Sequence, residues 1–376
     1  MKDLKQCRIE IDAIDQQLME LFEKRMALSK SVVEYKIENH LEIFQPERER
    51  EVIEKNLNRL NNDQLKEYAR CFIQEMMTVS KSYQSDLLPL ELDKNIKTEF
   101  KKDPLVGYQG IAGAFSQSAV ENFFGEGTKN IGYRDFEDVY VALENGEIDY
   151  GVLPIENSLT GSINDNYDLI RKYGFYIVGE TAVNVSQCLM ALPGTKIEDI
   201  RQVYSHPQGF EQSTKFFDKH KDYNLIPYSN TAISAKLVSD LKDKSKAAIA
   251  SERAAKLYDL KIIKKDVNDL KNNYTRFIVI GRDLECDETC DKVSILFSIE
   301  DTSGGLYTVI RDIKEFGLNM SKIESRPNRN NPWNYIFFVD FDGNLFDVNI
   351  KKAINTIARS SKYFKLLGCY RDVKCK

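Results

Sequence analysis

Residues 150–162 read Tyr150-Gly151-Val152-Leu153-Pro154-Ile155-Glu156-Asn157-Ser158-Leu159-Thr160-Gly161-Ser162. An apolar run stops here at a proline, which cannot donate to a sheet ladder, and small hydrogen-bonding residues follow. Gly161 permits backbone angles that other residues avoid. A connection from a strand to a helix would direct the side chains of Glu156, Asn157, Ser158, Thr160 and Ser162 toward one small space. We therefore expect a polar pocket at this point of the fold.

A capped helix start explains the same residues in simpler terms. Ser and Asn are ordinary N-cap residues, and Ser162 directly precedes a predicted helix over residues 163–173. Composition alone leaves the pocket and the helix cap as equal alternatives.

Length and charge fit an enzyme that acts on small molecules. The 376 residues suffice for two to four domains that each bury a core. The formal net charge is −5, with 53 basic and 58 acidic residues mixed along the chain, so we expect no nucleic-acid partner. The first ten residues are charged and no run approaches the length of a membrane span, which predicts a cytoplasmic protein with no membrane partner.

Cysteine usage gives no sign of a disulfide framework or a metal site. Seven scattered cysteines form an odd set, which suits reduced thiols. Cys286 and Cys290 are the only close pair, and none of the three histidines lies near them. The sequence therefore predicts no metal and ordinary loop cysteines.

The N-terminal region, residues 1–88, is expected to be all α-helical, with three helices. Asp3 can cap the first helix, a second begins at Pro46, and a third is capped by Asp63. Along the first helix a coiled-coil-like seam follows alternating steps of four and three, and its members are Cys7, Ile11, Ile14, Leu18, Leu21, Arg25, Leu28, Val32 and Tyr35.

Arg25 is the one charged member of that seam. A guanidinium in such a position needs a structural ion pair or an anionic ligand to offset its desolvation. Lys36 lies eleven residues on, about 16 Å along the same helical face, so the two cations could hold the ends of a small dianion. On the third helix Ser80 and Gln84 flank the apolar face one turn apart.

Residues 89–103 are expected to be a linker, and residues 104–284 an α/β layered region. A glycine turn over residues 109–116 has Gly-x-x-Gly-x-x-Gly spacing, which does not match the dinucleotide fingerprint, so no cofactor is expected. Ser116 either lines a cleft or caps a helix there. Ser205 and Gln208 are candidate substrate contacts, whereas His206, beside a proline in a turn, is expected to be structural.

Strand-to-helix turns recur through this region, interrupted by one excursion over residues 183–266. That pattern predicts two subdomains that face each other across a cleft. Residues 291–376 follow with a βαββαβ order, over residues 293–299, 306–316, 320–324, 335–340, 348–360 and 364–370.

The opening segment, with its Pro-Ile-Glu-Asn-Ser and Gly-Ser elements, resembles the signature of prephenate dehydratases, and Asn272-Asn273-Tyr274-Thr275-Arg276-Phe277 is similar to that family's Thr-Arg-Phe motif. The resemblance implies a fold like that of periplasmic solute-binding proteins, with Thr275 as the catalytic hydroxyl. It implies substrate contacts at Ser116, Glu156, Asn157, Ser158, Gly161, Ser162, Ser205, Gln208, Arg276 and Phe277.

The helical region resembles the chorismate mutase family through Arg8, Arg25, Lys36, Arg48, Glu49, Ser80 and Gln84. The resemblance implies that Arg8 and Arg25 bind the substrate carboxylates, Lys36 and Gln84 donate to the ether oxygen, and Arg48 and Glu49 position the ring. Arg8 lies 28 residues before Lys36, about 42 Å along a continuous helix. It could reach the same pocket only from an antiparallel partner, which predicts an intertwined homodimer or a higher homo-oligomer.

The C-terminal region resembles the ACT regulatory domain. Gly304-Gly305-Leu306-Tyr307 is similar to that family's Gly-Ala-Leu turn, with glycine replacing the usual alanine, and Ile323-Glu324-Ser325-Arg326-Pro327 matches the Glu-Ser-Arg-Pro motif of phenylalanine-inhibited dehydratases. Open backbone amides before a helix suit an amino-acid carboxylate, although a tight turn needs no ligand. The expected phenylalanine site comprises Gly304, Gly305, Leu306, Asn319, Glu324, Ser325, Arg326 and Pro327.

These features together predict a bifunctional enzyme that converts chorismate to prephenate and prephenate to phenylpyruvate, inhibited by phenylalanine. The alternative is a ligand-sensing regulatory protein with a helical dimerisation arm and no catalysis. Charged residues in the helical seam favour the enzyme, because a dimerisation arm has no use for them.

Overall fold

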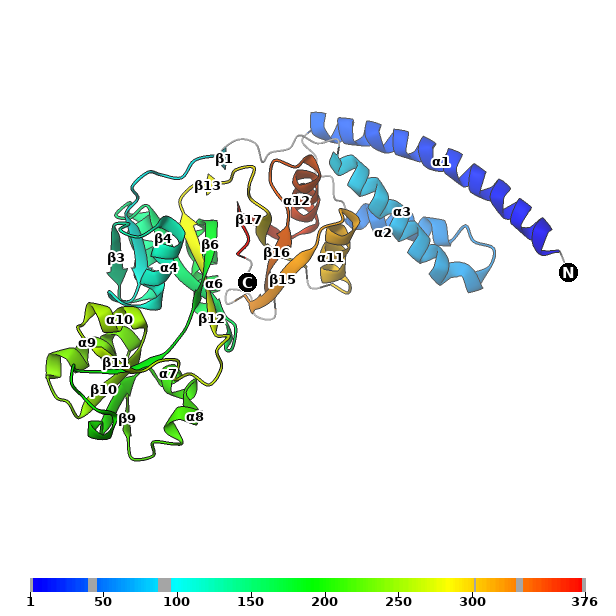
Figure 1. Ribbon diagram of the computed structural model, residues 1–376. Helices are drawn as coiled ribbons and strands as arrows, with labels where there is room; N and C mark the ends of the chain where they lie inside the picture. The colour runs from blue at the N-terminus through cyan, green and yellow to red at the C-terminus, as the bar shows by residue number, and fades with distance from the viewer. Residues whose placement is uncertain (1–2, 40–45, 87–95, 301, 329–333, 374–376) are drawn as a thin grey trace.

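The computed structural model describes residues 3–39, 46–86, 96–300, 302–328 and 334–373. A helical arm extends from one side of the molecule, a large α/β region lies on the other, and a four-stranded sheet with two helices lies between them (Figure 1). The predicted linker falls partly on residues 87–95, outside the described residues.

The arm consists of α1 (Leu4–Glu38), α2 (Pro46–Leu57), a 3-10 turn (Asp63–Leu65) and α3 (Lys66–Asp86), and α3 packs against both other helices. A small core of Leu57, Ile73 and Met77 holds α2 to α3. The cap of the third helix lies one residue earlier than expected. The side chain of Asn62, not Asp63, accepts from a backbone amide, that of Gln64, so the prediction of Asp63 as the cap was wrong.

Much of the apolar seam of α1 faces solvent. Ile11 is 55% exposed, Leu21 61% and Leu28 69%. Figure 1 shows the N-terminal half of α1 extending beyond α2 and α3. None of the described helices is both long and apolar enough to cross a bilayer.

The larger sheet of the α/β region has the order β3-β2-β4-β12-β6, with β5 paired to β4. Its strands are β2 (Val106–Gln109), β3 (Asn130–Tyr133), β4 (Tyr150–Asn157), β5 (Gly161–Ser162), β6 (Tyr176–Asn184) and β12 (Tyr274–Gly281). The first three are parallel, whereas β12 runs antiparallel to both β4 and β6. The helices that pack on it are α4 (Phe115–Phe124), α5 (Phe136–Glu144) and α6 (Asn164–Tyr173).

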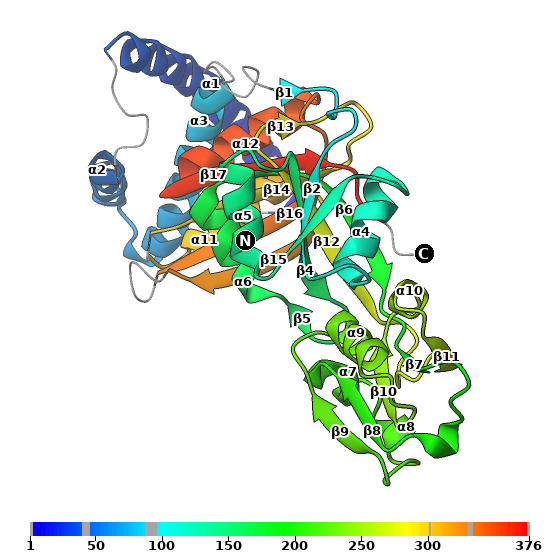
Figure 2. The same cartoon turned by 90° about the vertical axis from the view of Figure 1, so that its left-hand side faces the viewer.

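A second sheet, ordered β11-β7-β10-β8-β9, forms the lower lobe in Figure 2. Its strands are β7 (Cys188–Ala191), β8 (Gln202–Ser205), β9 (Asn224–Pro227), β10 (Lys246–Ala250) and β11 (Lys261–Lys264). Its helices are α7 (Pro207–Glu211), α8 (Thr214–Phe217), α9 (Thr231–Leu241) and α10 (Glu252–Leu257), with a 3-10 turn at Ile197–Asp199. The chain enters this lobe after β6 and returns at β12, so two extended connections join the lobes.

The C-terminal unit has the βαββαβ order that the sequence predicted. Its elements are β14 (Lys292–Ser298), α11 (Gly305–Glu315), β15 (Met320–Pro327), β16 (Tyr335–Asp342), α12 (Val348–Ser360) and β17 (Tyr363–Tyr370). The antiparallel sheet is ordered β15-β16-β14-β17, which makes β15 an edge strand. A short parallel pair, β1 (Ile96–Lys97) with β13 (Leu284–Glu285), lies beside the junction.

The C-terminal sheet packs face to face with the larger α/β sheet. Leu296, Phe338 and Leu367 share one apolar core with Ile278 and Ile280. Strands β17 and β6 approach so closely that a Cβ on Gly368 would lie 1.9 Å from the carbonyl oxygen of Ile177. On its other side the unit meets the arm, where Arg311 of α11 pairs with Glu75 of α3 at 3.5 Å.

The opening segment folds differently from the expected strand-to-helix turn. Strand β4 continues through Pro154, and a β-bulge opposite the Arg276–Phe277 step accommodates it. A hairpin, β4–β5, then precedes α6, whose cap position is Ile163 and carries no side-chain cap bond. Ser162 lies in β5 and is therefore not a helix cap, which removes the simpler reading of this segment.

Candidate functional site

A cleft of about 370 Å³ lies between the two lobes of the α/β region. The ends of β4 and β12 form one wall, and residues at the starts of α4, α7 and α9 line the remainder. Its polar lining includes Ser116, Asn157, Thr160, Gln208, Asn230 and Thr275. Among the described residues that line the cleft, none is a lysine or an arginine.

Asn157 organises the polar wall of this cleft. Its side-chain amide nitrogen donates to Asn273 Oδ1 at 2.7 Å and to Thr275 Oγ1 at 3.0 Å. Its Oδ1 accepts from the backbone amides of Leu159 and Thr160 at 3.0 and 3.1 Å. Asn157 is only 6% exposed, so its rotamer is held by these contacts from both sides.

Thr275 lies directly opposite Asn157 in the β4–β12 ladder and is 9% exposed. Because its hydroxyl oxygen accepts from Asn157, its own proton is available to a group in the cleft. Gln208 reaches across from α7, and its side-chain amide donates to Thr160 Oγ1 at 3.3 Å. Both walls of the cleft are thus joined by hydrogen bonds next to the Asn157–Thr275 pair.

Four predicted contacts, Ser116, Asn157, Gln208 and Thr275, line the cleft together. Ser116 is not the cap of α4, because Ala114 occupies that position. His206 is the N-cap of α7, accepting from the Gln208 amide through Nδ1, which fits its expected structural role, and it also lines the cleft.

The remaining predicted contacts do not line this cleft. Ser158 ties β4 to the start of β12, and its hydroxyl donates to the carbonyl of Asn272. Ser205 is fully buried and donates to the Ile249 carbonyl. Phe277 lies in the apolar core of the larger sheet, and Gly161 forms the β4–β5 turn with a φ of +81°. Ser205 and Phe277 are buried, whereas Ser158 and Gly161 are exposed, and none of the four lines the cleft.

Glu156, Ser162 and Arg276 face away from the cleft, toward the C-terminal sheet. Successive residues of a strand point to opposite faces, so Glu156 and Arg276 are on the far side from Asn157 and Thr275. Glu156 pairs with Lys322 at 2.7 Å, and Ser162 donates to Glu324 at 2.6 Å. The expectation that these three line the substrate pocket was wrong because it ignored this alternation.

Gln187 and Gln212 also line the cleft, and neither was predicted from the sequence. Gln187 is 3% exposed and lines the cleft, and its Oε1 has no hydrogen-bond partner within the described part of the chain. Gln212 accepts from Asn273, which itself accepts from Asn157. Gln187 lies just after β6, where the chain passes from one lobe to the other. This position at the junction of the lobes could have indicated it as a cleft residue.

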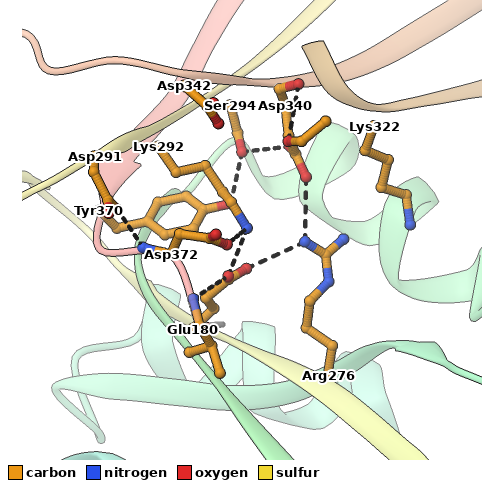
Figure 3. A network of polar contacts seen from close by, with 12 residues as sticks. Glu180, Arg276, Asp291, Lys292, Ser294, Lys322, Asp340, Asp342, Tyr370 and Asp372 are labelled. Carbon is orange, nitrogen blue, oxygen red and sulfur yellow. Dashed lines mark hydrogen bonds and ion pairs between the residues drawn. The ribbon is translucent and has the colours of Figure 1, made fainter. Parts of the chain in front are cut away.

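A buried network of charges joins the larger sheet to the C-terminal sheet (Figure 3). Arg276 pairs with Glu180 at 3.2 Å and with Asp340 at 3.3 Å. Glu180 also pairs with Lys292 at 2.6 Å and accepts from the Val373 amide at 2.8 Å. In Figure 3 these side chains converge from strands of both sheets.

The pKa values of Glu180 and Arg276 are both raised, for different reasons. Burial raises the pKa of the Glu180 carboxyl, although neighbouring Arg276 and Lys292 oppose that shift. Burial would lower the pKa of the Arg276 guanidinium, but the surrounding Asp340, Tyr370 and Glu180 raise it overall. The arginine therefore stays charged, and it needs its acidic partners at this depth.

In the arm, four of the predicted residues lie on the faces where the helices meet. Ser80 is 5% exposed, its hydroxyl lies 2.7 Å from that of Ser29, and the Gln84 amide donates to it at 3.4 Å. Glu49 pairs with Lys81 at 3.0 Å. Arg25 is half-buried, and its Nη1 has no hydrogen-bond partner within the described ranges.

Burial also lowers the pKa of two cations in the arm. Desolvation lowers the pKa of Arg25, and it lowers that of Lys36 against an opposing effect of the Glu49 carboxylate. Arg48 is exposed and pairs with Glu51 of its own helix at 2.9 Å, and Arg8 is exposed near the outer end of α1. Within a single chain, the helices therefore bring together Arg25, Lys36, Glu49, Ser80 and Gln84. Arg8 and Arg48 do not join them.

The expected phenylalanine residues divide between two ends of the C-terminal sheet. The turn at Gly304, with a φ of +85°, follows β14 at the end where Arg326 and Pro327 close β15. Asn319 lies at the opposite end and donates to Asp342 at 2.9 Å. The expectation that Asn319 joins the Gly304 turn in one site is therefore wrong within a single chain.

Alternation also divides the Glu-Ser-Arg-Pro segment. Glu324 accepts from Ser162, and Arg326 pairs with Asp168 at 3.3 Å, so both side chains face the α/β region. Ser325 is exposed on the other face, toward the side of α11. Gly305 and Leu306 begin α11.

The fold and the cleft define a multidomain protein with a two-lobed α/β unit, a helical arm and a four-stranded C-terminal unit. Residues 7–85 match the family described as chorismate mutase type II, and residues 106–285 match prephenate dehydratase. A bifunctional chorismate mutase/prephenate dehydratase from Aquifex aeolicus is 35% identical over 373 residues, covering 98% of each chain. The chain belongs to the family of bifunctional chorismate mutase/prephenate dehydratases.

Solved structures resemble the chain beyond the arm. A prephenate dehydratase from Arthrobacter aurescens, in complex with L-Phe, is 27% identical with a TM-score of 0.66, covering 71% of this chain and 90% of that chain. A protein described as a quorum quenching acylase is 26% identical with the same TM-score, covering 72% and 98%. Because one fold can carry unrelated reactions, the assignment of a reaction must rest on the site.

Proposed function

We propose that the arm converts chorismate to prephenate and that the cleft converts prephenate to phenylpyruvate. The observation that carries this proposal is the pairing of Asn157 with Thr275 in a cleft, in a chain whose arm gathers Arg25, Lys36, Glu49 and Gln84 on facing helices. Both reactions are driven largely by the substrate, so the protein needs groups that orient it and stabilise charge.

The mutase step is a pericyclic rearrangement that needs no nucleophile and no proton transfer. Arg25, with a buried Nη1 lacking a described partner, is placed to bind a carboxylate. Lys36 and Gln84 donate to the ether oxygen, where negative charge develops as the carbon–oxygen bond breaks. Glu49 positions the ring, and Ser80 holds Gln84 through their hydrogen bond.

We propose that Arg8 completes this site from a second copy of the chain. The exposed seam of α1 supports a partner helix, because apolar residues at coiled-coil spacing remain uncovered in one chain. Arg8 is about 42 Å from Lys36 along α1, which an antiparallel partner would bring alongside. Exposed Arg48 can turn toward the same pocket only by giving up its pair with Glu51.

In the dehydratase step, the carboxylate leaves as carbon dioxide, its electron pair aromatises the ring, and the ring hydroxyl departs. The departing oxygen needs one proton, and Thr275 is our candidate to donate it or to polarise the bond. A threonine hydroxyl is a weak acid, so the step requires a dry cleft. Backbone amides at the starts of α4 and α9 can hold the substrate carboxylates, since described lysines and arginines do not line the cleft.

We propose that the C-terminal unit is an ACT domain that binds phenylalanine. The βαββαβ order, the Gly304 turn and the Glu324–Pro327 segment support this, together with the L-Phe complex of the Arthrobacter relative. Ser325 and the Gly304 turn are the proposed contacts, and Glu324 and Arg326 link the site to the α/β region. We also propose a cytoplasmic location for the chain.

The test is to give chorismate to the purified chain and to follow prephenate and phenylpyruvate, with and without phenylalanine. Phenylpyruvate formation that phenylalanine suppresses is the expected result. Accumulated prephenate would keep the mutase and discard the role of Thr275. No loss of chorismate would favour the non-catalytic sensing protein, which the exposed face of α1 also fits as a dimerisation arm.

A further inference from the structure

Three cysteines from two distant parts of the chain meet at the junction between the α/β region and the C-terminal sheet. Cys286 follows β13, Cys290 lies just before β14, and Cys369 is in β17. Their sulfur atoms all lie within 4.8 Å of one another, and the structure shows them as free thiols. Cys286 and Cys369 are buried and Cys290 is partly buried. From the sequence only Cys286 and Cys290 are close, and Cys369 could not be added to them without the fold.

The spacing of these atoms fits a single tetrahedral metal ion. Zinc–sulfur bonds of about 2.3 Å place two sulfur ligands about 3.8 Å apart, so closing the cluster needs shifts of an ångström or less. Two cysteines with three residues between them in one loop, joined by a third from elsewhere, match the usual spacing of structural zinc ligands. Thiolate ligands favour zinc over magnesium or calcium.

The loop also has hydrogen bonds that suit a thiolate ligand. The backbone amide of Asp287 donates to Cys290 Sγ at 3.5 Å, which would offset thiolate charge. Asn344 fixes the loop by donating to the carbonyls of Asp287 and Cys290 at 2.9 and 2.7 Å. Thiols used only as apolar filling would not require these contacts.

The Asp287 carboxylate lies beside one of the three thiols, that of Cys290, and could move in as a fourth ligand. Its Oδ1 lies 3.6 Å from Cys290 Sγ, near the separation of about 3.5 Å expected for sulfur and oxygen on one zinc ion. The backbone amide of Thr289 donates to this carboxylate at 2.7 Å, which orients it as hydrogen bonds orient metal-bound ligands elsewhere.

We propose that Cys286, Cys290 and Cys369, with the Asp287 carboxylate, form a structural zinc site. The ion would fasten the loop between β13 and β14 to the last strand of the C-terminal sheet. The ion would also hold Lys292 and Tyr370 of the buried charge network in place. Lys292 lies two residues from the ligand Cys290, and Tyr370 lies one residue from the ligand Cys369. This inference is independent of either proposed reaction.

The test is cobalt and zinc titration of the reduced full-length chain after chelator treatment. The parent protein should bind one equivalent of Co²⁺ with a thiolate-to-metal charge-transfer band, and Zn²⁺ should displace it. Cys290→Ser and Cys369→Ser should each lose the band and bind zinc at least tenfold more weakly. Cys71→Ser, at an exposed position on α3, should behave as the parent.

Folding of each variant is checked by far-ultraviolet circular dichroism, so that loss of metal binding is not confused with unfolding. No band in the folded parent protein, or a band that survives Cys369→Ser, would overturn the site. A disulfide between any two of the three cysteines in the protein isolated without oxidant would overturn it as well. Asp287→Asn should weaken zinc binding, and unchanged affinity would refute Asp287 as the fourth ligand.

Discussion

At the scale of single residues, the proposed dehydratase reaction depends on the hydroxyl of Thr275. Thr275→Val keeps the shape of the side chain and removes the proposed proton donor, so we expect phenylpyruvate formation from prephenate to fall by roughly 10²- to 10⁴-fold. Conversion of chorismate to prephenate, in the separate arm, should be unchanged. Stopped assays with each substrate measure both rates.

The matched control is Thr275→Ser, which restores a hydroxyl and should recover much of the dehydratase rate. A Thr275→Val protein that dehydrates prephenate within twofold of the parent rate would remove Thr275 from the reaction.

Lys36 gives the mutase a predictable dependence on pH. The ammonium must be protonated to donate to the ether oxygen, and burial lowers its pKa below that of an ordinary lysine. The mutase rate should therefore be full at low pH and fall as pH rises through this lowered pKa. Lys36→Arg should move the falling limb to higher pH, because a guanidinium keeps its proton.

The pH–rate profile for chorismate loss, taken with the dehydratase rate as an internal reference, is the measurement. Identical falling limbs in the parent and in Lys36→Arg would show that another group controls the profile.

At the scale of elements, α1 makes a prediction about assembly. If Arg8 acts in the partner's site, Arg8→Ala and Lys36→Ala chains should each lose mutase activity alone. A mixture, unfolded and refolded together, should recover about a quarter of the parent activity, because half the dimers are mixed and each has one intact site of two.

Mutase assays before and after co-refolding measure the recovery, with each variant refolded alone as the control. An equal mixture that stays inactive although hybrid dimers form would mean that Arg8 acts within its own chain or has no role.

The contact of β17 with β6 limits which residue fits at position 368. Gly368→Ala would put a Cβ 1.9 Å from the Ile177 carbonyl oxygen, so the two sheets must separate. We expect a loss of about 1–3 kcal/mol in the free energy of unfolding, seen as a lower Tm by calorimetry. Gly305→Ala, whose Cβ would have 3.1 Å to its nearest neighbour, should cost less. Equal Tm values for the two variants would contradict the close contact.

At the scale of the whole molecule, the charge network is one of several contacts between the C-terminal sheet and strands β4, β6 and β12, beside the shared apolar core and the Glu156–Lys322 pair. Arg276 and Thr275 are consecutive, so a movement of Asp340 or Lys292 that shifts Arg276 also shifts the Thr275 hydroxyl, our proposed proton donor. Asp340→Asn should leave the dehydratase rate without phenylalanine within a few-fold of the parent and weaken inhibition by phenylalanine at least fivefold.

Inhibition curves for phenylpyruvate formation test this, with Asp283→Asn at an exposed ion pair as the control. If Asp340→Asn were inhibited as strongly as the control, the coupling would have to run by another route.

Much of this architecture follows from the sequence alone. Helical periodicity locates α1, α2 and α3, and the strand and helix order of the C-terminal unit agrees with its pattern to within a few residues. The motif around Thr275 indicates the cleft. Hydrophobic period and turn residues are local signals, so local elements are the part that can be predicted.

The misses at the cleft and at the cysteine cluster share one physical origin, because they depend on three-dimensional placement. The bulge at Pro154 keeps β4 intact, and side-chain alternation sends Glu156 and Arg276 away from the substrate. Cys369 joins Cys286 and Cys290 only after β17 pairs with β14. Long-range pairing of this kind has no local signature in one sequence.

The pairing of Glu156 and Arg276 behind Asn157 and Thr275 has a practical consequence for strain engineering. A strain that produces phenylalanine needs an enzyme without the proposed inhibition by phenylalanine, and changes on β4 or β12 would alter the proposed dehydratase site as well. Positions on β14 and β16 touch the same network from the sensor side and lie one layer away from the reacting atoms. We therefore expect substitutions on those two strands to weaken inhibition by phenylalanine while the dehydratase rate is kept.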